Sequence, residues 1–253
     1  MKKLKSILVF FFLACVIVLV GVAVVHHLNM TCNTLEVCVE TVSGPTPLTE
    51  KVAHRLITDS EANPIGKKVR KVDAAALETA LQKNPWFNKI TATTVKGSRL
   101  IVTLSAKCPI ALLCLSDADP LLLADNGQLL PDDAHITNLP VINGSITKLS
   151  PNFSVKKSKQ TGLKNAYSTA LFLCKNKDYA AQYPQIFVRP DGLVELYSIY
   201  GDQPVLIGNA DKLPEKLANV DIAYKKGILT AGNYKALDAR FHNRIYAIKS
   251  QTN

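Results

Sequence analysis

The longest uninterrupted apolar stretch of the chain lies at its N-terminus. Ile7 to Val25 form a run of about 19 residues without a charge or a proline, close to the roughly 20 residues that cross a bilayer core as a helix. Lysines precede the run, whereas the residues directly after it carry no lysine or arginine, so the positive-inside rule places the N-terminus in the cytoplasm. The pattern predicts a cytoplasmic tail over 1–5, a transmembrane helix over 6–27 and an extracytoplasmic remainder from Met30 onward.

Three other interpretations of this segment remain open. One is a buried core helix, which would need tertiary cover on all sides, and the position of so apolar a segment at the end of the chain argues against it. A cleaved secretory signal would have small residues at an A-x-A-like site after the apolar run, where this chain has His26-His27-Leu28-Asn29-Met30. Cys15 follows a sequence that faintly resembles a lipid-attachment site, although the residues after it stay apolar through Val25. The uncleaved span is therefore the preferred interpretation.

The first periodic segments after the span predict a strand and then a helix. Leu35 to Val42 alternate with period two, as in a half-buried strand, and Ser43-Gly44-Pro45 follow as a turn. Thr46-Pro47 is typical of a helix start, with threonine as N-cap and proline at the first helical position. The apolar residues that follow at helical spacing are Leu48, Val52, Ala53, Leu56 and Ile57.

A second helix and a hairpin complete this module. The helix is expected after Asp73, its N-cap, and before Pro85. Its apolar face consists of Ala76, Leu77, Ala80 and Leu81. Ile90–Val95 and Leu100–Ser105 are rich in β-branched residues and flank a turn at Gly97, which indicates a hairpin. The element order is strand, helix, helix, strand, strand.

Beyond Leu113 the pattern changes to short strands separated by glycine-containing turns. This predicts a second, mainly antiparallel β unit. The expected strands are Leu121–Ala124, Gln185–Arg189, Leu193–Tyr197, Val205–Ile207, Lys235–Phe241 and Arg244–Lys249, with helical inserts near Ser158–Asn176 and Leu213–Lys225. The fold class is therefore α+β, with an α/β domain over 34–112, a β domain over 113–249 and a tail over 250–253.

Charge and cysteine content add two constraints. A net charge of +10 ordinarily favours nucleic acid or anionic surfaces as partners, but the predicted topology places nearly all of this charge outside the cytoplasm, which argues against nucleic acid. The six cysteines include no C-x-x-C, and no Cys/His group has metal-finger spacing. We interpret some of them as buried small hydrophobic residues and leave their disulfide pairing open.

A search for catalytic motifs is mostly negative. The sequence has no H-E-x-x-H, G-x-S-x-G, P-loop or S-x-x-K, so no catalytic residue, cofactor or metal is expected. Asp117-Ala118-Asp119 keeps one enzymatic alternative open, because a D-x-D could hold a divalent metal in a single-span glycosyltransferase. The clustered antiparallel hairpins argue against this alternative, since a nucleotide-binding fold needs alternating βαβ units.

Several short motifs, taken in order, resemble those of the FtsQ/DivIB family of bitopic bacterial division proteins. They are Asn63-Pro64-Ile65-Gly66 leading to Val72-Asp73, Asn84-Pro85-Trp86-Phe87, Cys108-Pro109-Ile110-Ala111, Leu123-Ala124-Asp125-Asn126-Gly127, Leu139-Pro140-Val141-Ile142-Asn143-Gly144, Asp191-Gly192, Ile207-Gly208 and Leu237-Asp238-Ala239-Arg240-Phe241. The resemblance covers nearly the whole chain and implies that 34–112 is a POTRA-type domain. Within it, Trp86 is expected to be a core residue packed against the helices at Leu56 and Leu81.

The resemblance implies a non-enzymatic scaffold of the divisome, located in the cytoplasmic membrane at the septum. Its implied partners are single-span coiled-coil proteins of the FtsL and DivIC/FtsB types and, through them, the septal peptidoglycan synthases. No small-molecule substrate is expected. The alternative is a POTRA-bearing adaptor of another envelope machine, for secretion or outer-membrane assembly.

The C-terminal strands are the predicted partner site. Alternation in this segment puts Leu237, Ala239 and Phe241 on one face and Asp238 and Arg240 on the other. Because the segment ends the chain, we expect it to end the sheet, and an edge strand can accept a peptide strand through its unpaired backbone groups. The family resemblance implies the same place.

The predicted partner-binding residues are Leu237, Asp238, Arg240, Phe241, Asn243, Ile245, Tyr246, Ala247, Ile248 and Lys249. Among them, Ile245 and Ala247 are expected to be outward-facing edge positions. The alternative is an ordinary closing hairpin whose edge is protected by the charges of Arg240, Arg244 and Lys249.

Overall fold

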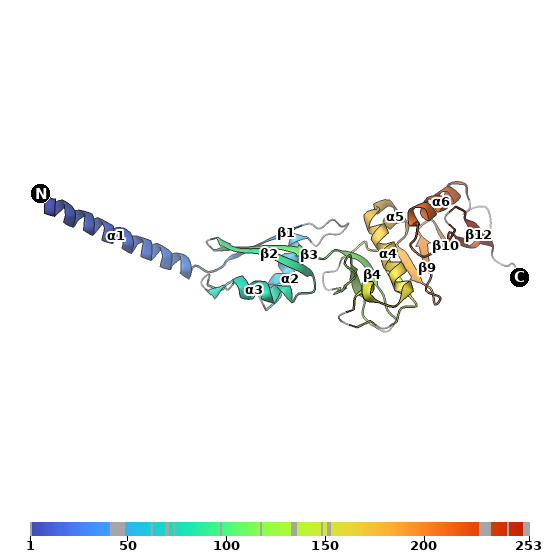
Figure 1. Ribbon diagram of the computed structural model, residues 1–253, viewed down its shortest axis with the longest axis horizontal. Coiled ribbons are helices and arrows are strands. Elements are labelled where there is room, and N and C mark those ends of the chain that lie inside the picture. The colour runs from blue at the N-terminus through green and yellow to red at the C-terminus, as the bar shows by residue number, and fades with distance from the viewer. Residues whose placement is uncertain are drawn as a thin grey trace. The chain divides into compact units, whose positions relative to one another are not determined.

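The computed structural model describes residues 2–40, 49–61, 63–68, 71–72, 74–96, 98–116, 118–132, 136–147, 149–150, 153–227, 234–241 and 243–249 (Figure 1). Side chains are described for the same residues apart from 2–10, 26–28, 74 and 91–96. The chain divides into two compact units. The first contains Met1–Glu40 and Leu48–Ala106, and the second contains Lys107–Asn253.

The N-terminal helix α1 (Lys2–Asn29) contains the apolar run. The side chains of residues 11–25 are all exposed, with Phe11 and Phe12 among them. Within the described part of the chain, no helix combines the length and the hydropathy that a membrane span needs. The span predicted over 6–27 stays a prediction.

A three-stranded sheet forms the first unit. It is built from β1 (Thr34–Glu40), β2 (Phe87–Lys96) and β3 (Arg99–Ala106), in the order β1-β3-β2. β3 pairs with β1 in parallel and with β2 as an antiparallel hairpin. Alternate residues of β3 are buried, as a strand with one covered face requires.

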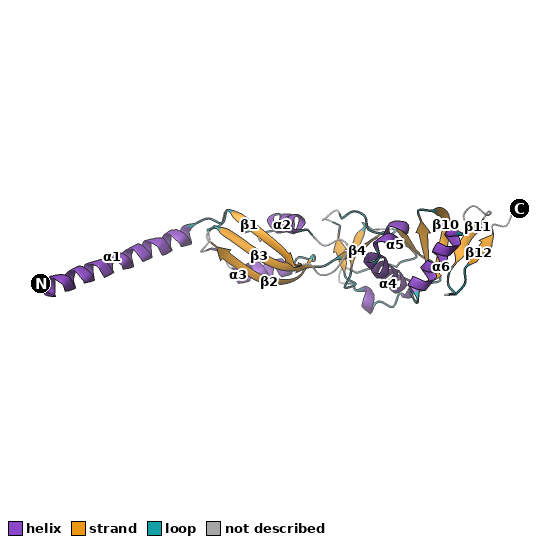
Figure 2. Ribbon diagram, turned by 90° about the horizontal axis from the view of Figure 1, so that it is seen from above, coloured by secondary structure: helices purple, strands orange, loops and turns teal. Residues whose placement is uncertain are grey.

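Helices α2 (Glu50–Thr58) and α3 (Ala74–Gln82) lie on the same side of this sheet (Figures 1 and 2). The order β-α-α-β-β is as predicted. Trp86 is fully buried, which confirms it as a core residue. The inward positions of α2 are Ala53 and Ile57, whereas Leu56 is only partly buried.

The predicted cap of the first of these helices was wrong. Thr49 is the N-cap of α2, because its extended backbone lets its hydroxyl accept a hydrogen bond from the Val52 N–H (3.3 Å). Glu50 then stands in the first turn, where a negative charge suits the helix dipole. Thr46, Pro47 and the other predicted cap, Asp73, lie outside the described residues.

The second unit contains a nine-stranded sheet. Its strands are β4 (Pro109–Leu113), β5 (Leu121–Ala124), β6 (Leu129–Pro131), β7 (Val141–Gly144), β8 (Gln185–Val188), β9 (Val194–Ser198), β10 (Gly201–Gly208), β11 (Tyr234–Asp238) and β12 (Tyr246–Lys249). Their order is β12-β11-β10-β9-β8-β7-β4-β5-β6. Most neighbours pair antiparallel, as predicted, but β4 with β7, β7 with β8, and β10 with β11 pair in parallel.

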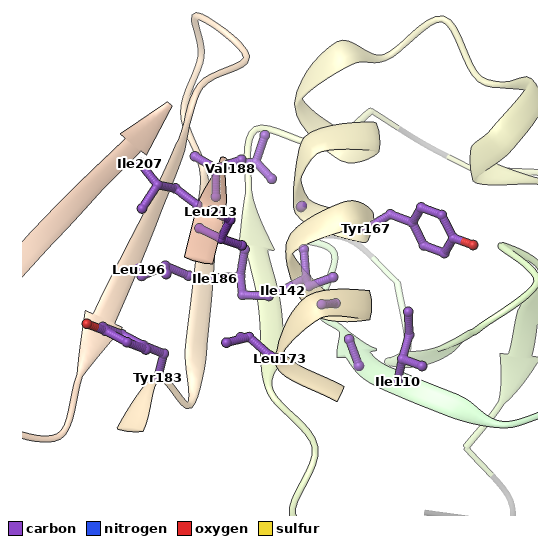
Figure 3. Close-up of a cluster of buried hydrophobic side chains, with 14 of the residues drawn as sticks. Ile110, Ile142, Tyr167, Leu173, Tyr183, Ile186, Val188, Leu196, Ile207 and Leu213 are labelled. Carbon is purple, nitrogen blue, oxygen red and sulfur yellow. The ribbon is translucent and has the colours of Figure 1, made fainter. Parts of the chain in front are cut away.

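Three helices and one 3-10 turn (Val155–Lys157) accompany the sheet. α4 (Thr161–Lys175) packs against β8, β4 and β9, and α6 (Leu213–Lys225) has the predicted bounds. α5 (Lys177–Gln182) was not predicted. Figure 3 shows the core between α4 and the strands, with Ile142, Ile186 and Leu196 from adjacent strands beside Leu173 of α4.

Gly144 ends β7 in a conformation that suits glycine. Its φ is +109°, and a Cβ at this position would overlap the carbonyl oxygen of Val188 in the adjacent β8. The parallel pairing of β7 with β8 therefore depends on the missing side chain.

Candidate partner-binding site

The predicted partner site lies at one end of the nine-stranded sheet. β12 is the last strand in the order and pairs antiparallel with β11, so that Asp238 is opposite Tyr246 and Leu237 is opposite Ala247. β11 in turn pairs in parallel with β10. Within the described residues, the outer side of β12 has no neighbouring strand. The expectation that this segment ends the sheet is confirmed.

The two faces of the segment differ from the predicted alternation. Leu237 and Ala239 are buried as expected, but Asp238 is buried too and Phe241 is 54% exposed. The regular strand stops at Asp238, and the backbone beyond it turns, with the Arg244 N–H donating to the Phe241 carbonyl (3.1 Å). A period-two pattern describes side chains only while the strand continues, so it fails after this point.

The orientation of β12 was also predicted wrongly. Ile245 and Ala247 are partly buried and pack against the core, whereas Tyr246 and Ile248 are exposed. Their positions follow from the register, because Ala247 is opposite the buried Leu237. The exposed residues of β12 are therefore Tyr246, Ile248 and Lys249.

Asp238 and Arg240 form a partly buried ion pair. Arg240 Nε donates to Asp238 Oδ1 (2.9 Å), Arg240 Nη2 donates to Oδ2 (2.6 Å), and the Arg240 backbone N–H also donates to Oδ1 (3.1 Å). The hydrogen bonds from Arg240 lower the pKa of Asp238, with burial acting in the opposite direction. The stem of Arg240 lies over Gly208, where an added Cβ would be 3.1 Å from Arg240 Cγ. Arg240 thus holds the end of β11 beside the end of β10.

Two aromatic rings form the exposed apolar part of the site. Phe241 and Tyr246 meet edge to face, with ring centroids 5.4 Å apart, and Tyr246 is 48% exposed. Asn243 lies in the connection between them and is exposed. The structure thus brings Phe241, Tyr246 and Ile248 to the surface, while it takes Leu237 and Asp238 into the interior.

A cavity of about 350 Å³ beside β12 was not predicted from the sequence. Its lining is Arg189, Glu195, Pro204, Leu206, Lys235, Ala236 and Ile248. Arg189 Nη1 donates to Glu195 Oε1 (2.9 Å), so part of its charge is paired. These residues come from β9, β10, β11 and β12 and from the turn after β8. No local pattern could have found them, because they meet only through the pairing of strands that are distant in the sequence.

A metal ion needs several His, Cys, Asp or Glu side chains close together. In the part of the chain that the structure describes, no group of three or more such side chains could hold a metal ion. Asp117 of the D-x-D lies outside the described residues. The six cysteines are free thiols, and Cys32, Cys108 and Cys174 are buried.

A three-stranded β-α-α-β-β unit followed by a mixed sheet with an open C-terminal edge defines a POTRA-type domain joined to a β domain. Comparison with protein families agrees with this class. Residues 30–105 match the POTRA-like domain, and residues 109–247 match FtsQ/DivIB, C-terminal related, which is more than half of the chain. A search of curated proteins found no match.

The chain belongs to the FtsQ/DivIB, C-terminal related family. The predicted resemblance is confirmed by both matched segments. Membership in this family supports, in broad terms, a scaffold role in cell division.

Proposed function

We propose that the chain is a non-enzymatic scaffold of the bacterial divisome that binds a strand from a partner at β12. Its partners are single-span coiled-coil proteins of the FtsL and DivIC/FtsB types, which connect it to the septal peptidoglycan synthases. The apolar run in α1 anchors it in the cytoplasmic membrane, with the N-terminus in the cytoplasm and the two units outside.

The observation that carries the proposal is the outer side of β12, which pairs with no described strand and lies next to exposed apolar side chains. Backbone N–H and C=O groups on an open edge give affinity to an added strand, and neighbouring side chains give specificity. Tyr246, Ile248 and Phe241 are of the apolar and aromatic type that dominates binding energy in interfaces. Arg240 does not protect this edge, because its guanidinium is already paired with Asp238.

The anchor is supported by the length and composition of the apolar run, and by the exposure of its side chains. A run of about 19 apolar residues is long enough to cross a bilayer core. The side chains of residues 11–25 are exposed rather than packed against a core, and so many exposed apolar side chains favour a lipid environment.

A matched pair of substitutions tests the partner site in the full-length protein. Ile248→Glu places a charge on the exposed edge, and Ile65→Glu makes the same change in the first unit, at a residue of nearly equal exposure (38% and 40%). Ile248→Glu should reduce recovery of the coiled-coil partners from membranes at least about ten-fold, a cost of roughly 1.4 kcal/mol, and should fail to support division. Ile65→Glu should do neither.

Proline provides a second pair of variants. At Ile245 or Ala247 it removes one backbone donor, but both side chains also pack against the core, so circular dichroism must first confirm folding. Partner recovery at the wild-type level from folded Ile248→Glu and proline variants would exclude β12 as the site. Loss of partner recovery in the Ile65→Glu variant alone would place the partner site in the first unit.

Localisation separates this function from that of an adaptor in another envelope machine. A fluorescent fusion to the full-length protein should form a ring at mid-cell. A uniform envelope signal throughout the cell cycle would favour the adaptor and contradict the division role.

A further inference from the structure

The second unit has another cavity that the partner site does not use. It measures about 490 Å³ and is lined by Gln182, Tyr200, Asp221, Tyr224 and Lys225. This volume falls within the roughly 300–1,000 Å³ of typical binding cavities. Gln182 ends α5, Tyr200 belongs to the turn between β9 and β10, and the other three residues lie in the last turns of α6. α5 and α6 lie close together in Figures 1 and 2.

Asp221 gives this cavity a negative charge. Its Oδ2 accepts a hydrogen bond from the Tyr179 hydroxyl (3.1 Å), and its Oδ1 accepts one from Gln182 Nε2 (3.2 Å). Both donors are neutral, and burial together with the hydrogen bond to Asp221 raises the pKa of Tyr179, so its hydroxyl stays protonated at neutral pH. Asp221 forms no ion pair with any residue that the structure describes. A carboxylate has about four acceptor positions, so it can take further hydrogen bonds.

Two tyrosine rings stand beside this charge. Tyr200 and Tyr224 meet edge to face with ring centroids 6.1 Å apart, and both line the cavity. Tyr200 is half exposed, so its ring is accessible from solvent. Aromatic faces attract cations, and the planar guanidinium group of arginine also stacks on them.

Two exposed apolar side chains belong to residues next to those that line the cavity. Ile199 precedes Tyr200 in the turn and is 61% exposed, and Ile222 follows Asp221 in α6 and is half exposed. Exposed large apolar side chains next to a charged cavity are typical of a peptide-binding surface rather than of a site for a small ion.

We propose that this cavity binds the arginine side chain of a partner segment that has apolar residues on both sides of that arginine. The guanidinium group donates to Asp221 and stacks on the exposed ring of Tyr200, next to the edge-on ring of Tyr224. The flanking apolar residues cover Ile199 and Ile222. The site is separate from the β12 edge and does not depend on it.

The positive charge of Lys225 opposes the binding of arginine in this cavity. Lys225 also lines the cavity, is exposed, and repels an incoming cation. Removing its charge should therefore tighten binding, whereas removing the charge of Asp221 should weaken it. Opposite effects from two residues of the same cavity are not expected from a general change in stability.

The test uses full-length protein labelled with 3-fluorotyrosine and observed by fluorine NMR. The probes are a capped pentapeptide with a central arginine flanked by leucines, the same peptide with citrulline, which is neutral and nearly isosteric, and capped free arginine. The arginine peptide should shift the signals of Tyr200 and Tyr224, each assigned by its Tyr→Phe variant, and should bind roughly five-fold more tightly than the citrulline peptide. Asp221→Asn should remove this difference, and Lys225→Gln should increase it.

Three outcomes would overturn the proposal. Equal binding of the arginine and citrulline peptides to the wild-type protein would exclude a site that recognises the charge of arginine. This comparison uses the wild-type protein alone, so it does not depend on the folding of any variant. Shifts confined to tyrosines outside the cavity would place the peptide elsewhere. Equal affinity for capped free arginine and the arginine peptide would mean that the flanking apolar residues do not contribute to binding. None of these outcomes bears on the β12 edge, which is tested separately.

Discussion

The Arg240 guanidinium holds the Asp238 carboxylate through two parallel hydrogen bonds, 2.9 Å from Nε and 2.6 Å from Nη2. A buried carboxylate is costly without such a partner, so the pair stabilises the end of β11, next to the proposed binding edge. Arg240→Ala should lower the free energy of unfolding at pH 7 by about 1–3 kcal/mol, a range reduced from that of a fully buried pair because Arg240 is partly exposed.

The effect of Arg240→Ala should depend on pH in a defined direction. The folded-state pKa of Asp238 is lowered, chiefly by the hydrogen bonds from Arg240. Its contribution to stability is therefore present above the ordinary carboxyl pKa of about 4 and is lost as the pH falls through the folded-state pKa. Urea unfolding followed by circular dichroism should show the difference from wild type shrinking in acid. Arg244→Ala is the control, because Arg244 is exposed and pairs with no described carboxylate. A penalty that stays constant with pH would contradict this role.

Trp86 should carry a large share of the stability of the first unit. Its side chain is fully buried, and truncating an aromatic of this size typically costs about 3–5 kcal/mol. We expect Trp86→Ala to speed hydrogen exchange of the β2 and β3 amides in the full-length protein. Trp86→Phe, which keeps most of the buried ring area, should have a smaller effect. Unchanged exchange in Trp86→Ala would mean that the residue is not a core anchor.

Gly144 and Gly66 provide a matched test of close packing. Both have positive φ, but a Cβ at Gly144 would overlap the Val188 carbonyl, whereas a Cβ at Gly66 would meet nothing within 4 Å. Gly66→Ala should cost only the backbone strain of about 1–2 kcal/mol. Gly144→Ala should cost clearly more and should lower the thermal unfolding midpoint of the second unit. Equal costs would show that β7 and β8 can separate without penalty.

The proposed topology has a direct test in intact cells. Protease added outside cells whose outer barrier has been opened should degrade the part of the chain beyond Met30 and leave an N-terminal fragment in the membrane. A mature protein that begins near Asn29 would show that the apolar run is removed, and the anchored arrangement would then be wrong.

Local features of the fold were largely predictable from the sequence. The apolar periodicity of α6 gave its bounds, Leu213–Lys225, and Leu121–Ala124 was predicted as the strand β5. α5 was missed because its six residues are too few to show a helical period. The cap of α2 was misplaced because threonine occurs twice near its start, and Pro47 favoured the earlier one.

The candidate site was predictable in position but not in orientation. The last strand was expected at the edge of the sheet, and β12 is there. The outward faces of Ile245 and Ala247 were wrong because the register of β12 is set by its pairing with β11, which sequence alternation alone does not give. The parallel pairing of β10 with β11 is equally non-local, and it brings Lys235 of β11 into the same cavity as Glu195 of β9. The limits of the domains predicted over 34–112 and 113–249, and the residues that bind partners, stay predictions.

The strand order of the second unit has a consequence for how many molecules can assemble on it. The sheet ends in β6 on one side and β12 on the other. β6 spans three residues and ends in Pro131, whose nitrogen has no hydrogen to donate, so it is a poor template for another strand. Among the strands that the structure describes, β12 is thus the one receptive edge, and the sheet can grow in that direction only. A sheet with a single receptive edge is a chain terminator rather than a link, so these described strands give copies of the chain no means of joining edge to edge into a fibre.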